Sequence, residues 1–85
     1  MKSKRFRSMN AWVDDYGTFQ VFRSYATPIA VKMEKHWITS EQKYSQTTSK
    51  QKSIFLRDVK EEPVVVDHKN FVWLLDNLNV NRGRA

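Results

Sequence analysis

Apolar and polar side chains alternate through much of the first half of the chain, which is the pattern of β-strands with one buried face. Phe19 and Val21 share one parity in the first clear segment, and Ile29, Val31 and Met33 share one parity in the next. The alternation is interrupted by turn-forming residues, which separate the segments. Strands are therefore predicted over residues 10–13, 18–25, 29–37 and 43–47.

The second half of the chain changes to helical spacing. The sequence Thr48-Ser49-Lys50-Gln51 matches a capping box, with Thr48 as the N-cap, and predicts a helix over residues 49–59. Asp67 is the expected N-cap of a second helix over residues 67–79. Its apolar stripe keeps the i, i+3, i+4, i+7 spacing with Phe71, Leu74, Leu75 and Leu78.

Between the two predicted helices, Val64-Val65-Val66 is short, apolar and β-branched, which favours an edge strand or a buried connector. The pattern as a whole predicts an α+β fold, with an antiparallel sheet of three or four strands. We expect the two C-terminal helices to pack on one face of that sheet, the face of Phe19, Val21, Ile29, Val31 and Met33.

The length of 85 residues predicts a single α+β domain over residues 9–80. A basic, disordered N-terminal tail is expected over residues 1–8, and a basic C-terminal tail over residues 81–85. The apolar runs are far shorter than the roughly 18–20 residues that cross a bilayer, and no apolar segment follows the basic start. We therefore expect a cytoplasmic protein without a membrane partner.

Several kinds of chemistry are excluded by composition. The chain has no cysteine, so disulfides and thiolate chemistry are absent, and its two glycines cannot make a P-loop or a dinucleotide fingerprint. His36 and His68 are far apart in sequence and no third metal ligand accompanies either of them. No cofactor, no metal and no enzymatic activity are expected.

The formal net charge of +6 is concentrated at the two ends of the chain and in one internal segment. Residues 1–7 contain four basic and no acidic side chains, and residues 43–60 are also rich in lysine. The hydroxyls and lysines around the predicted helix start suit an anion, although plain capping is the more ordinary explanation of the hydroxyls. The candidate nucleic-acid- or anion-binding residues are Lys2, Lys4, Arg5, Arg7, Lys43, Thr47, Thr48, Ser49, Lys50, Lys52, Arg57, Arg82 and Arg84.

Two segments also carry a resemblance. Ser24-Tyr25-Ala26-Thr27-Pro28-Ile29-Ala30 followed by Lys43-Tyr44-Ser45-Gln46-Thr47-Thr48-Ser49-Lys50-Gln51 resembles a pattern in short, uncharacterised accessory proteins of bacteriophages and mobile elements. Gln51 stands where that pattern often has histidine. The resemblance covers residues 20–60, implies a small phage-type accessory protein in the bacterial host, and transfers no catalytic residue.

Two functions fit these features. The first is a non-enzymatic binding protein that engages nucleic acid or a host nucleoprotein complex through the basic tails and residues 43–60. The alternative is a protein-binding phage inhibitor of a host enzyme or defence system, similar in role to anti-CRISPR proteins. For that alternative Trp73 is the candidate interface residue, because it lies off the apolar stripe of the second helix. A homodimer through a sheet edge is a further expectation.

Overall fold

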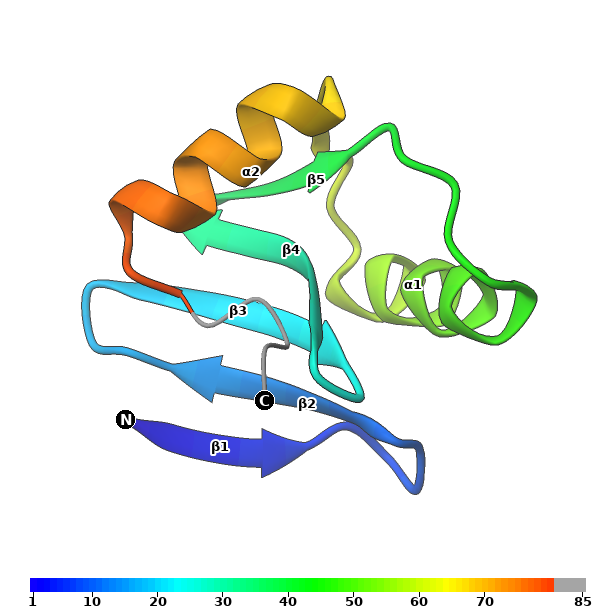
Figure 1. Cartoon of the computed structure of the whole chain (residues 1–85). Helices are drawn as coiled ribbons and strands as arrows, with labels where there is room; N and C mark the ends of the chain where they lie inside the picture. The colour runs from blue at the N-terminus through cyan, green and yellow to red at the C-terminus, as the bar shows by residue number, and fades with distance from the viewer. Residues whose placement is uncertain (81–85) are drawn as a thin grey trace.

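The computed structural model describes residues 1–80 and consists of one six-stranded sheet and two helices (Figure 1). The elements are β1 (Lys2–Arg5), β2 (Ala11–Asp15), β3 (Phe19–Ser24), β4 (Thr27–Met33), β5 (His36–Ser40), α1 (Gln46–Val59), β6 (Val64–Val66) and α2 (His68–Asn77). The strands lie in chain order, and every neighbouring pair is antiparallel except β5 and β6, which are parallel. The predicted α+β class is confirmed, but the sheet is larger than the three or four strands expected.

The two helices cover opposite faces of the sheet, so the expectation that both pack on one face is wrong. Phe55 of α1 stacks on Phe22 of β3, with ring centroids 4.0 Å apart. Phe71 and Leu75 of α2 pack on the other face, in a cluster that includes Val21. The physical reason is that consecutive strand residues point to opposite faces, and β3 is apolar at both parities.

A β-bulge changes which face one predicted core residue occupies. The register between β3 and β4 shifts at Phe22 and Arg23, where Arg23 pairs with Pro28. Proline has no N–H to give to the ladder, which is consistent with the irregularity at this point. Ile29 consequently packs in the α1 cluster with Phe22, whereas Val31 packs in the α2 cluster as predicted.

Two boundaries also differ from the prediction. The segment over residues 29–37 is two strands, because the chain turns between β4 and β5 with Glu34 at a φ of 57°. The strand expected over residues 43–47 is absent, since α1 already begins at Gln46. The N-cap of α1 is Ser45 rather than Thr48: its hydroxyl accepts a hydrogen bond from the Thr48 backbone N–H over 3.2 Å.

Other local predictions are confirmed. Asp67 is the N-cap of α2, and its carboxylate accepts from the Asn70 backbone N–H over 2.7 Å. Val64–Val66 forms the edge strand β6. Neither helix in residues 1–80 has the length and apolar character that crossing a membrane would require.

The basic N-terminus is where the structure departs most from the prediction. Residues 2–5 were expected to be part of a disordered tail. They form strand β1, and all four of them pair with residues of β2. Hydrogen bonding to β2 and the bond from the Ser3 hydroxyl to Asp14, 2.6 Å long, give the segment partners that hydrophobic patterning does not reveal. The predicted C-terminal tail, with Arg82 and Arg84, lies outside the described residues.

Candidate functional site

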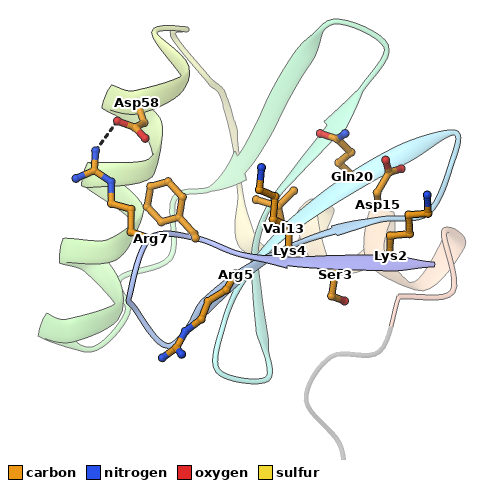
Figure 2. Close-up of a pocket in the computed structure, with 10 residues that line it drawn as sticks. Lys2, Ser3, Lys4, Arg5, Arg7, Val13, Asp15, Gln20 and Asp58 are labelled. Carbon is orange, nitrogen blue, oxygen red and sulfur yellow. Dashed lines mark hydrogen bonds and ion pairs between the residues drawn. The ribbon is translucent and has the colours of Figure 1, made fainter.

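A groove of about 680 Å³ lies along β1, between the α1 face of the sheet and the C-terminal end of α1 (Figure 2). It is open to solvent, and its lining includes four basic and two acidic residues. The lining residues are Lys2, Ser3, Lys4, Arg5, Phe6, Arg7, Val13, Asp15, Gln20 and Asp58. We call this feature the β1 groove.

Lys2 and Lys4 are the two cations that point into the β1 groove. They are two residues apart on one strand, so their side chains project from the same face, and Figure 2 shows both on the side of Val13 and Gln20. Lys4 lies opposite Val13 in the ladder, and Lys2 lies opposite Asp15. Within residues 1–80 neither lysine forms an ion pair or a side-chain hydrogen bond. Both ammonium groups are therefore available to an anion.

The end of the groove next to α1 is held in place by polar and aromatic contacts. Arg7 donates from Nη2 to Asp58 Oδ1 of α1 over 2.5 Å, and both side chains are about half exposed. Phe6, the residue before Arg7, packs edge-on against Phe22 and Phe55, with centroid distances of 5.6 and 5.3 Å. These contacts join the chain after β1 to α1 and give the groove an apolar wall.

The opposite face of β1 carries a second set of basic and aromatic side chains. Arg5 and Ser3 point away from the two lysines (Figure 2). The Arg5 and Arg23 guanidinium carbons lie 5.9 and 4.6 Å from the centroid of Trp12, on either side of it in the ladder. Arg23 is paired with Asp14, whereas Arg5 forms no ion pair with any of residues 1–80 and donates from Nε to the Met9 carbonyl oxygen over 2.7 Å. Positive charge thus projects from both faces of the strand.

The residues around the start of α1, expected to bind an anion, mostly have partners inside the protein. The Ser49 hydroxyl donates to the Tyr44 carbonyl oxygen over 3.3 Å, and the Thr48 and Ser24 hydroxyls lie 3.1 Å apart. Lys52 donates from Nζ to the Ser40 carbonyl oxygen over 3.1 Å. Burial lowers the pKa of Lys52 below its ordinary value of 10.5. These contacts favour the structural explanation of the capping sequence.

The remaining candidates in this segment are exposed, and none of them lines the β1 groove. They are Lys43, Thr47, Lys50 and Arg57. Of the candidate residues, the groove brings together the four from residues 2–7 and omits those of residues 43–60. Sequence reasoning missed the other six lining residues, because residues 2–5 have no alternation of apolar and polar side chains that would indicate a strand. These six are Ser3, Phe6, Val13, Asp15, Gln20 and Asp58.

Two further residues considered in the sequence, His68 and Trp73, do not line the β1 groove. His68 receives a structural role, because its Nδ1 lies 2.8 Å from the Ser40 hydroxyl. No three histidine, aspartate or glutamate side chains within residues 1–80 are grouped so as to hold a metal ion. Trp73 is 65% exposed on α2, away from the core stripe.

Comparison with known proteins gives one match. Residues 2–71 match a family of unknown function (DUF8033), and this stretch includes the whole β1 groove and both sheet edges. No curated protein and no solved structure matches the chain.

Proposed function

The chain belongs to a family of unknown function, DUF8033, and from its site we propose that it binds nucleic acid, alone or in a nucleoprotein complex, along strand β1. The observation that supports this most directly is the pair Lys2 and Lys4, held on one face of a strand above a groove and without an ion-pair partner among residues 1–80. Phosphate contacts by lysine and arginine supply most sequence-independent affinity for nucleic acid.

The ordered backbone of β1 affects how Lys2 and Lys4 can bind nucleic acid. In a disordered tail each lysine would lose its conformational freedom on binding, whereas the backbone of β1 is already ordered by its ladder with β2. Residues two apart on a strand are about 6.6–6.8 Å apart along it, so both ammonium groups can reach phosphates of the same nucleic-acid strand. This spacing supports a track along β1.

The surroundings of the two lysines suit the rest of a nucleotide chain. Phe6 and Val13 are partly buried and offer apolar surface in the groove for sugars or bases. Arg5 supplies a further cation on the other face of β1, beside Trp12, and aromatic and guanidinium groups are common stacking partners of unpaired bases. A nucleic acid following the strand would meet positive charge on both sides.

The direct test is fluorescence anisotropy with labelled single-stranded and duplex oligonucleotides of the same length. Wild-type protein is expected to bind, and the Lys2→Gln/Lys4→Gln variant is expected to bind much more weakly with an unchanged melting temperature. A protein that binds neither oligonucleotide at low salt would contradict the proposal.

Trp73 supports a second candidate function, the binding of a host protein such as an enzyme or a defence complex. It is 65% exposed and its backbone carbonyl accepts from the Asn77 side chain over 2.9 Å. Exposed tryptophans are enriched among interface hot spots. A partner captured from nuclease-treated bacterial lysate by wild type and by Lys2→Gln/Lys4→Gln, but not by Trp73→Ala, would favour this function over nucleic-acid binding.

A further inference from the structure

The two edges of the sheet carry opposite charge. β1 and β6 are the outer strands, and each pairs with only one neighbour in the part of the chain that the structure describes. β1 is basic and all four of its residues are exposed. β6 is uncharged but is flanked by exposed Glu61 and Glu62 on one side and by exposed Asp67 on the other, and these three outnumber the exposed Lys60 and Lys69 just beyond them. An unpaired edge is a template for another strand, and its charges decide which strand.

The register of the sheet shows how a second copy would fit. One row of directly opposed residues runs across all six strands on the α1 face: Lys4, Val13, Phe22, Ala30, Thr39 and Val65. Four antiparallel pairings followed by one parallel pairing make β1 and β6 point the same way. A copy placed beside β6 with the same face up would therefore continue the row with its own Lys4.

The charges on the two edges favour the pairing of β1 with β6 of another copy over a symmetric pairing of two β1 or two β6 strands. Two β1 strands placed together would oppose lysine to lysine, and two β6 strands would bring their acidic flanks together. Like charges placed opposite each other disfavour a pairing, whereas opposite charges favour it. With Lys4 beside Val65, parallel register would bring Lys2 next to Pro63, close to Glu62, and Arg5 next to Val66, close to Asp67.

We propose that copies of this chain associate head to tail, with β1 of one copy adding to β6 of the next as a parallel strand. The contact would cover Val64 and Val65, which are 48% and 59% exposed. Because the two surfaces differ, the association is heterologous and builds either a ring or an open array. It goes beyond the proposed function, since it uses the backbone edge of β1 and requires no nucleic acid.

Sedimentation of the nucleic-acid-free full chain tests the association. The average mass should rise above the 10.1 kDa monomer with protein concentration and fall again with salt. Val65→Lys should abolish the rise, because it would oppose a lysine to Lys4 of the next copy. The matched control Trp73→Lys places the same charge at an exposed apolar residue on α2 and should leave the rise intact. A monomer at every concentration, or a rise that survives Val65→Lys, would overturn the proposal.

Cysteine cross-linking tests the pairing itself, because the chain has no cysteine of its own. Lys4→Cys and Val65→Cys proteins of different tag length are mixed and oxidised, after each is shown to melt as wild type does. The mixed disulfide should be the main product, well above either homodimer. Homodimers equal to or above the mixed product would show a symmetric or random contact and would refute head-to-tail pairing.

Discussion

Arg23 donates from Nε to Oδ2 of Asp14 over 2.6 Å, across the pairing of β2 with β3, and Asp14 is buried. The other carboxylate oxygen of Asp14 accepts from the Ser3 hydroxyl of β1 over 2.6 Å. One buried carboxylate therefore joins three strands at the end of the sheet that carries the candidate site. The next residue, Asp15, is exposed and accepts a turn hydrogen bond from the Gly17 backbone N–H over 2.8 Å.

Arg23→Ala is expected to lower the free energy of unfolding by about 3 kcal/mol, because it leaves the buried Asp14 carboxylate without its charged partner. Urea denaturation measures the loss. Arg7→Ala serves as the control: it breaks the exposed pair with Asp58, which should be worth at most about 1 kcal/mol. Equal losses of unfolding free energy in the two variants would show that the buried pair stabilises the fold no more than the exposed pair does.

Ser24→Ala should destabilise the fold by about 1–3 kcal/mol, because the Ser24 hydroxyl is the donor to the buried Gln51 side-chain oxygen. This hydrogen bond joins β3 to α1 inside the core. Gln51→Leu in the Ser24→Ala background removes the unsatisfied amide and should recover part of the loss. If Ser24→Ala alone melted at the wild-type temperature, the bond would be of no energetic consequence.

Ser45→Ala should cost about 0.5–2 kcal/mol, since Ser45 is the N-cap of α1. Ser45→Asp should retain most of the stability, because aspartate also accepts at an N-cap and its charge suits a helix N-terminus. Thermal unfolding monitored by circular dichroism makes the comparison. A loss in Ser45→Asp as large as in Ser45→Ala would argue against capping as the role of this side chain.

The lowered pKa of Lys52 predicts a pH dependence of stability. The folded state holds the Lys52 proton less tightly than the unfolded state, so the penalty is complete below the folded pKa. Stability should therefore rise with pH between the folded pKa and the ordinary value of 10.5. Lys52→Met should flatten this rise.

The comparison with Lys52→Met is best made in a Tyr44→Phe background. Burial raises the pKa of Tyr44 above its ordinary value of 10.0, and this makes stability fall as pH rises past 10. Urea unfolding across this pH range gives the difference between the two proteins. Identical pH slopes would mean that Lys52 has no desolvation cost in the folded state.

The sequence predicted the elements with strong local signals and missed those that depend on tertiary partners. Asp67 and the triple valine gave the α2 cap and β6 correctly, because caps and β-branched runs are local features. Capping chemistry before α1 was recognised but placed at Thr48, since several consecutive hydroxyl residues there can all serve as caps.

The candidate site lies on β1, and the formation of β1 depends on contacts with residues that are distant in the sequence. β1 has no hydrophobic pattern, and it is a strand because β2 offers an edge to it and Asp14 accepts from Ser3. Similarly, β3 is apolar at both parities, but a dry second face becomes evident only when a helix is seen to cover it. Charge counting grouped the basic residues of the N-terminus in the sequence, whereas their division between two faces of a strand required the ladder register.

The dependence of nucleic-acid affinity on salt tests the central claim most directly. We predict that Lys2→Gln/Lys4→Gln lowers the slope of log affinity against log salt by about 0.7–0.9 for each phosphate that the variant no longer neutralises. Lys43→Gln/Lys50→Gln removes the same charge from two exposed lysines outside the β1 groove and should leave the slope unchanged. Equal reductions in the two variants, or a reduction only in the second, would contradict a nucleic-acid site on β1.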